Sequence, residues 1–128
     1  MTQQKELGDR GEALAAQFLH ALGLEILATN WRHKRGEVDI IARSEDELII
    51  VEVKARSSNY FGEPEESVDA HKQELLAMCA WAFLEEHGLD LPVRFDVISI
   101  LLDGDSEPKL HHIPDAFFPI DEGPAEIF

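Results

Sequence analysis

The sequence predicts a three-layer α/β protein in which a mixed sheet of about five strands is flanked by helices. Two long segments carry apolar residues at helical spacing, and five shorter segments are expected to be strands. Their order along the chain is αβββαββ, and the helix between the third and fourth strands implies a parallel crossover. A length of 128 residues suits one domain, expected over residues 1–118 and followed by an acidic tail at residues 119–128.

The first helix is expected at Gln4–Leu22, where apolar residues recur at every third or fourth position. Gly23 is expected to cap its C-terminus. Because glycine lowers helix stability, Gly8 and Gly11 predict close packing of this helix against another backbone. Glu12 borders the apolar stripe and has two interpretations: an acid that favours the N-terminal end of the helix dipole, or a carboxylate directed at a functional site.

A first strand is expected at Glu25–Arg32, and strands at Glu37–Arg43 and Glu47–Lys54 are expected to form an antiparallel hairpin. With Glu45 and Asp46 as a two-residue loop, the numbers of paired residues sum to 91. Strand side chains alternate between the two faces of a sheet. One face of the hairpin is therefore expected to be wholly apolar, with Val38, Ile40, Ala42, Ile49, Val51 and Val53 on it.

A loop is expected at Ser57–Glu66, and a second helix at Val68–His87 that ends at Gly88. The middle of this helix is apolar on all sides, which predicts a buried connector. The next strand, Val93–Leu102, is β-branched and continuous enough to lie inside the sheet. A short edge strand is expected at Lys109–Ile113.

The hairpin register brings two acids together. Asp39 is expected directly opposite Glu52, and Glu37 opposite Lys54. Like charges in this position, with Cβ atoms about 5 Å apart, are destabilising, and a divalent cation between them would turn repulsion into coordination. The alternative is a solvated face on which Glu37 and Lys54 form a cross-strand ion pair. The apolar residues around these charges favour the metal site, because uncompensated charge at the end of a buried strand is costly.

The charge of the chain is unevenly distributed. The net charge of −15 argues against nucleic acid as a partner. The window from Arg32 to Arg56 is nevertheless neutral, with six basic and six acidic residues, so the rest of the chain carries the whole net charge. A cation bound by its acids would make this window locally positive.

Cysteine usage and apolar runs bear on the location of the protein. A single cysteine, Cys79, in an apolar helical segment predicts a buried thiol in a reducing compartment. The N-terminus has no apolar leader, and the longest apolar run, of ten residues, is shorter than a membrane span. A cytoplasmic protein without a membrane partner is expected. His111 and His112 would face opposite ways in a strand, so they are expected to be structural rather than to chelate a metal together.

Six segments of the chain carry a recognisable pattern. They are GDRGE (8–12), NWRHKRGEVDII (30–41), VEVKAR (51–56), FG (61–62), RFDVI (94–98) and HIPDAF (112–117). Together they resemble the YraN-like uncharacterised protein family, and more distantly the restriction-endonuclease-like nucleases that include archaeal Holliday-junction resolvases. The resemblance implies a restriction-endonuclease-like fold and a metal-dependent nuclease.

The resemblance also implies roles for individual residues. Asp39 and Glu52 match two carboxylate ligands of Mg²⁺, for which Mn²⁺ can substitute, and the carbonyl of Val53 would be a third ligand. Lys54 matches the lysine that orients or deprotonates the attacking water and stabilises the charge of the transition state.

Further positions are less closely defined by the resemblance. Glu12 matches a helical acid that reaches the metal in several relatives, and Glu37 is either a ligand or a partner of Lys54. Candidate phosphate contacts are Arg32, Arg35, Arg56 and Lys72. The expected partner is structured or branched DNA, with RNA as a second candidate. Many such nucleases pair to cut both strands, so a homodimer stays open. The acidic body of the chain motivates an alternative: a catalytically silent module that keeps the nuclease fold to bind nucleic acid or a partner protein.

Overall fold

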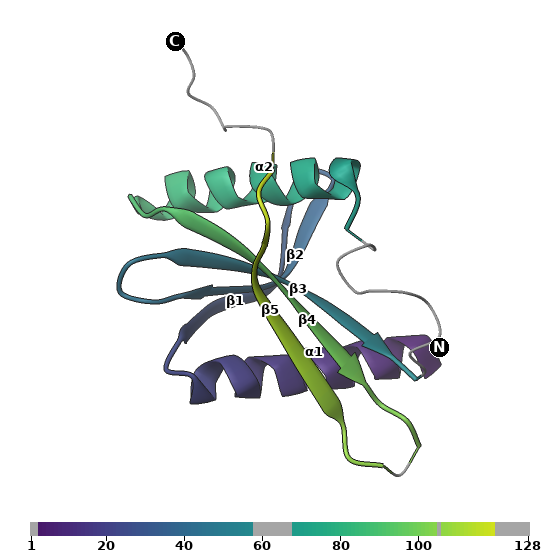
Figure 1. Cartoon of the computed structure of the whole chain (residues 1–128). Coiled ribbons are helices and arrows are strands. Elements are labelled where there is room, and N and C mark those ends of the chain that lie inside the picture. The colour runs from purple at the N-terminus through teal and green to yellow at the C-terminus, as the bar shows by residue number, and fades with distance from the viewer. Residues whose placement is uncertain (1–2, 58–67, 105, 120–128) are drawn as a thin grey trace.

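The computed structural model describes residues 3–57, 68–104 and 106–119 (Figure 1). Two helices and five strands follow each other in the predicted order: α1 (Gln3–Ala21), β1 (Glu25–His33), β2 (Gly36–Arg43), β3 (Leu48–Arg56), α2 (Ala70–His87), β4 (Val93–Leu101) and β5 (Lys109–Phe117). The strands lie in the sheet in sequence order, with β3 and β4 parallel and the other neighbouring pairs antiparallel. The predicted α/β fold class is confirmed.

The sheet has a core on each face because a helix covers each one (Figure 1). The helix α2 packs on the face formed by Val38, Ile41, Leu48, Ile50, Phe95 and Val97. The helix α1 packs on the opposite face, formed by Ile40, Ile49, Val51, Ile98 and Ile100. In α2, every residue from Leu75 to Leu84 is buried or half-buried, as its apolar middle predicts.

Local signals end both helices. Gly23, at φ +92°, donates its N–H to the carbonyl of His20, and Gly88, at φ +62°, caps α2. Asp69 is the N-cap of α2, and its side chain accepts a hydrogen bond of 2.9 Å from the backbone N–H of Lys72. This cap places α2 two residues later than predicted and fixes Lys72 in its first turn.

The packing of α1 explains one of its two glycines. A Cβ atom at Gly11 would lie 2.5 Å from the Cβ of Ala55 on β3, so only glycine permits this close approach. The expectation of close packing is therefore confirmed at Gly11. It is wrong at Gly8, where a Cβ atom would have no described neighbour within 4 Å.

The predicted hairpin register is confirmed over four pairs, from Arg43 with Leu48 to Ile40 with Val51. The expected uniform apolar face is wrong at Val38, which lies on the α2 side of the sheet, whereas Ile40 lies on the α1 side. The alternation breaks at Asp39 between them. On the neighbouring strand, Asn30 adopts a left-handed conformation with φ +51°. Both strands are thus irregular at the same level of the sheet.

The edge strand β5 is longer than expected, because its pairing with β4 resumes beyond Ile113 and ends with Phe95 beside Phe117. An irregularity in register lies between these two segments, and Asp115 has φ +53° there. The expected loop lies outside the described residues from position 58 onward, and the acidic tail from position 120 onward. Neither of the two helices described has the length and apolarity to cross a membrane.

Candidate metal centre

Asp39 lies where β2 and β3 separate. The ladder between these strands ends at Ile40 and Val51, so the expected direct pairing of Asp39 with Glu52 does not form. Instead, the Asp39 carboxylate accepts a hydrogen bond of 2.8 Å from the backbone N–H of Val53. The N–H and carbonyl of one strand residue point to the same side, so the carbonyl of Val53 is also directed toward β2.

The surroundings of Asp39 disfavour its ionised form. Burial and then the charge of Glu52 raise the pKa of Asp39 to about 7, although the N–H of Val53 opposes the shift. The two carboxylates therefore interact despite the missing ladder pair. Glu52 itself is only 4% exposed. A buried acid pair of this kind requires a positive charge nearby.

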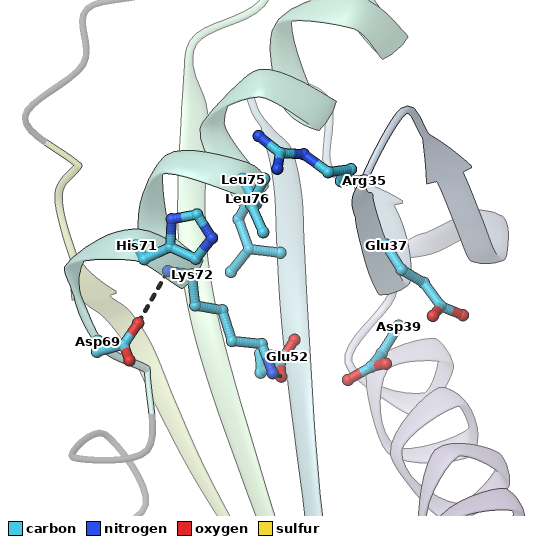
Figure 2. Close-up of a pocket in the computed structure, with 9 residues that line it drawn as sticks. All are labelled: Arg35, Glu37, Asp39, Glu52, Asp69, His71, Lys72, Leu75 and Leu76. Carbon is cyan, nitrogen blue, oxygen red and sulfur yellow. Dashed lines mark hydrogen bonds and ion pairs between the residues drawn. The ribbon is translucent and has the colours of Figure 1, made fainter.

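That positive charge is Lys72. Its ammonium forms an ion pair with Glu52, and Figure 2 shows the side chain reaching from the first turn of α2 to this carboxylate. Burial lowers the pKa of Lys72, but the contact with Glu52 and the charge of Asp39 outweigh it, so that the net shift is upward. The residue expected to contact phosphate thus lies within the acidic site.

Lys54 is half-buried on β3, two residues beyond Glu52 and hence on the same face of the strand. Its expected pairing with Glu37 is wrong, because the ladder between β2 and β3 ends at Ile40 and Val51. Glu37 lies opposite Arg32 on β1. The two side chains are exposed and their charged atoms lie 3.7 Å apart. Strand β2 pairs with β1 beyond the point where it leaves β3, which the hairpin alone did not predict. The catalytic role of Lys54 stays a prediction.

Asp39 and Glu52 line a cavity of about 390 Å³ between the sheet and α2 (Figure 2). Its other lining residues are Arg35, Glu37, Asp69, His71, Lys72, Leu75 and Leu76. Acids dominate the wall formed by the strands, whereas basic side chains come from the β1–β2 turn and the first turn of α2. His71 and Asp69 were not expected at the site. The capping rule could have identified Asp69, but no local signal in the sequence singles out His71.

The remaining predicted residues differ in their relation to this cavity. Glu12 projects from α1, and burial followed by the charge of Asp39 raises its pKa. Its carboxylate is therefore electrostatically coupled to the site without lining the cavity. Of the candidate phosphate contacts, Arg35 and Lys72 line the cavity, Arg32 is joined to it through Glu37, and Arg56 ends β3.

The residues present suit a hard divalent cation that retains water. Over the described ranges, no three His, Cys, Asp or Glu side chains lie close enough together to hold a metal ion. The donors are two carboxylates and the carbonyl of Val53, a partial set of oxygen ligands such as Mg²⁺ accepts while it keeps several waters. A structural zinc site would need four nitrogen or sulfur ligands, which this set does not offer.

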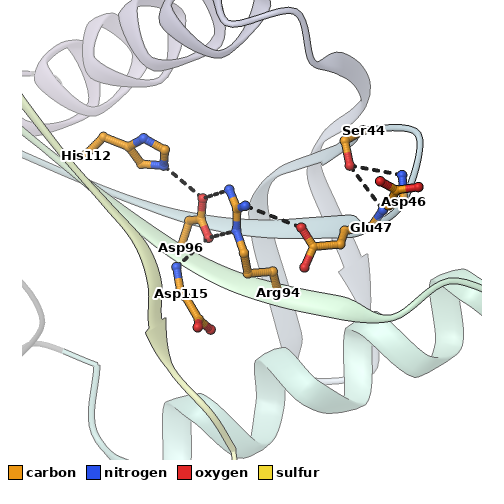
Figure 3. Close-up of polar contacts among 7 residues, drawn as sticks. All are labelled: Ser44, Asp46, Glu47, Arg94, Asp96, His112 and Asp115. Atoms are coloured by element: carbon orange, nitrogen blue, oxygen red, sulfur yellow. Dashed lines mark hydrogen bonds and ion pairs between the residues drawn. The ribbon is translucent and has the colours of Figure 1, made fainter.

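A second aspartate, which is fully buried, has a contrasting environment (Figure 3). Asp96 on β4 is fully buried and accepts hydrogen bonds from Arg94 at 2.8 and 2.9 Å, from His112 at 2.8 Å and from the backbone N–H of Asp115 at 3.0 Å. Burial alone would raise the pKa of Asp96, but these donors lower it. Since its oxygens are satisfied, this cluster is structural. His112 lies within this hydrogen-bond network, as its expected structural role requires.

The fold and the site define an α/β protein with paired carboxylates at the point where β2 and β3 separate. The model of the uncharacterised protein family UPF0102 matches residues 11–100, which include both carboxylates and Lys72. The chain belongs to this family.

Relatives in several bacteria match most of the chain. A UPF0102 protein of Flavobacterium psychrophilum is 42% identical over 118 residues, which are 92% of this chain and 98% of the relative. A UPF0102 protein of Porphyromonas gingivalis is 41% identical over 118 residues, covering 91% and 87% of the two chains. One of Clostridioides difficile is 43% identical over 114 residues, covering 88% and 97%. The family description and these names specify no activity.

Proposed function

We propose that this protein is a Mg²⁺-dependent nuclease that hydrolyses phosphodiester bonds in structured or branched DNA, with Mn²⁺ able to replace Mg²⁺. One observation carries the proposal: Asp39 and Glu52 face a single cavity that basic side chains also line. Carboxylates suit a hard divalent cation, and basic groups suit the phosphate of the substrate. RNA is a second substrate class with the same phosphate chemistry.

The residues have distinct roles in this proposal. Asp39, Glu52 and the carbonyl of Val53 hold the ion, and the hydrogen bond from Val53 fixes the orientation of Asp39. When bound, the ion supplies Lewis-acid catalysis at the scissile phosphate. Lys54, on the same face of β3 as Glu52, orients or deprotonates the attacking water. Arg35 stabilises negative charge on the phosphate in the transition state.

The arrangement of the elements supports a place among the restriction-endonuclease-like nucleases. An aspartate on β2 and the Glu52-Val53-Lys54 string on β3 lie where two antiparallel strands diverge. A helix then connects β3 to the parallel strand β4. This is the arrangement that the sequence resemblance implies for those enzymes.

The main alternative is a module that binds nucleic acid or protein without cleavage. Two observations favour it: the net charge of −15, which repels a polyanion, and the ion pair by which Lys72 already neutralises Glu52. In such a module the carboxylates and Lys72 would stabilise the fold, and partner binding would not require a metal.

Cleavage assays separate these two functions. Purified protein is incubated with junction, flap, nicked and single-stranded DNA and with RNA, in Mg²⁺, Mn²⁺ or EDTA. We expect cleavage of at least one DNA substrate with metal and a loss of about 100-fold or more in D39N and K54M, with K109A as an exposed control that retains activity. Full activity in D39N would contradict the site. Tight binding without cleavage, unaffected by EDTA, would favour the module.

A further inference from the structure

In the proposed reaction Glu52 is a metal ligand and Lys72 is not, yet the two side chains form an ion pair. Glu52 is almost fully buried, and Lys72 reaches it from another layer of the fold. The side chain of Lys72 is 39% exposed, so one side of it borders the cavity. Without this ammonium, both Glu52 and Asp39 would lack a cation among the described contacts around them.

A divalent ion held by Asp39 and Glu52 would take the position that Lys72 uses. Two cations on one buried carboxylate repel each other at short distance, and the repulsion is weakly screened there. The α2 backbone need not move to relieve it, because Asp69 caps the helix through the backbone N–H of Lys72. The flexible four-carbon stem of Lys72 is free to turn toward solvent.

We propose that Lys72 is an internal counter-ion that neutralises the metal-free site and leaves Glu52 when a divalent cation binds. This inference rests on the proposed function, since it concerns the same carboxylates. It assigns Lys72 a regulatory role that is distinct from the expected catalytic role of Lys54.

The exchange has a consequence for substrate binding. A displaced Lys72 remains tethered to the first turn of α2, on the cavity wall that also carries His71 and faces Arg35. Its freed ammonium can then pair with a phosphate of the substrate. Metal and phosphate binding are thereby coupled, and by linkage each increases the affinity for the other.

Lysine acylation tests the exchange in the full chain without nucleic acid. The protein is treated briefly with an acetylating reagent in EDTA or in saturating Mg²⁺ or Mn²⁺, and the acetylation of each lysine is measured by mass spectrometry. Metal binding is measured in the same samples by the shift in melting temperature. Lys109, which is exposed on β5, serves as the internal control. We expect acetylation of Lys72 to rise at least threefold with metal, while that of Lys109 stays constant.

A variant at Glu52 tests whether this residue holds Lys72 in the metal-free protein. E52Q removes the partner charge with little change in volume, so Lys72 should be acetylated several-fold faster in EDTA, whereas E37Q should have no such effect. Metal binding with unchanged acetylation of Lys72 would overturn the exchange but leave the proposed function intact. Absence of metal binding in the wild type would contradict both. Unchanged Lys72 reactivity in folded E52Q would show that Glu52 does not hold it.

Discussion

At the scale of single residues, two aspartates, Asp39 half-buried and Asp96 fully buried, interrupt strand pairing with opposite electrostatic results. Asp96 accepts hydrogen bonds from Arg94, His112 and a backbone N–H, so it is stabilised as an anion. Asp39 has one backbone donor and a neighbouring acid, and its pKa rises to about 7. A carboxylate whose pKa is raised, as at Asp39, is typical of sites that bind a cation or perform catalysis.

The raised pKa of Asp39 predicts that this residue makes the folded protein less stable as pH rises. The unfolded chain releases this proton near pH 4, whereas the folded chain keeps it up to about pH 7. Folding therefore takes up a proton in this window, and Asp39 lowers the free energy of unfolding as pH rises through it. D39N should be more stable than the wild type by about 2 kcal/mol at pH 8 in EDTA, with a smaller difference at pH 4.5. Urea unfolding at both pH values measures this. An equal difference at the two pH values would contradict it.

Asp96 predicts the opposite response. Its pKa is lowered, so its ionised form stabilises the fold above about pH 4, and this contribution is lost as pH falls further. D96N leaves Arg94 with a weakened partner in a buried site and should lower the free energy of unfolding by about 3 kcal/mol at pH 7. The half-exposed Glu47, which also contacts Arg94, is the control: E47Q should change stability by less than about 1 kcal/mol. Equal effects of the two variants in urea unfolding would refute the distinction.

The sequence was sufficient to single out Asp39 and Glu52 as neighbouring acids. It did not predict that Lys72 forms an ion pair with Glu52. Hairpin register and a family pattern act over short separations, and both acids lie within one hairpin. Lys72 is twenty residues from Glu52, and its approach depends on where α2 begins over the sheet. No local periodicity contains that information. The expected pairing of Glu37 with Lys54 was wrong because the ladder between β2 and β3 ends before it reaches these residues.

At the scale of elements, contacts of the backbone determine how the strands that hold the site residues pair. The hairpin register was predictable because a two-residue loop fixes it. Its end at Ile40 and Val51 was not, because it depends on an aspartate side chain that takes over a backbone donor. The same device at Asp96 and Asp115 explains why β5 continues past its expected end.

The close contact of α1 with β3 predicts that alanine substitutions at two glycines of α1 have opposite effects on stability. G11A should lower the free energy of unfolding by about 1–3 kcal/mol, because its Cβ atom would overlap Ala55 next to the site. G8A lies in the same helix and meets open space, so it should raise that free energy by up to about 1 kcal/mol. Thermal and urea unfolding of the two variants provide the comparison. Stabilisation by G11A would show that the helix does not approach β3 this closely.

At the scale of the whole molecule, an acidic protein places a few basic side chains at its cavity. The whole net charge of −15 lies outside residues 32–56, and the basic groups at the cavity are few. Recognition of nucleic acid would therefore be local and dependent on charge neutralisation at the site. The acidic composition was evident from the sequence, whereas the placement of Arg35 and His71 on facing walls of the cavity required the fold.

This distribution predicts weak, metal-assisted binding of DNA. The logarithm of the affinity against the logarithm of salt concentration should have a slope of about −2 to −3, as expected for two or three neutralised phosphates. Fluorescence anisotropy with a labelled junction and K54M protein, which keeps both carboxylate ligands, in EDTA or Ca²⁺ would limit cleavage during the measurement. R35A should make the slope less negative by about 1, whereas K109A should leave it unchanged. A flat salt response would exclude recognition through the phosphate backbone.

The central claim is that Asp39 and Glu52 jointly bind a divalent cation. The most direct test is a crystal soaked in Mn²⁺ at about pH 8, where Asp39 is ionised, and measured for anomalous scattering. The account predicts one strong peak within about 2.0–2.4 Å of oxygens from both carboxylates, with Lys72 turned away from Glu52. A soaked crystal with Lys72 still on Glu52 and no anomalous peak between the two acids would contradict it.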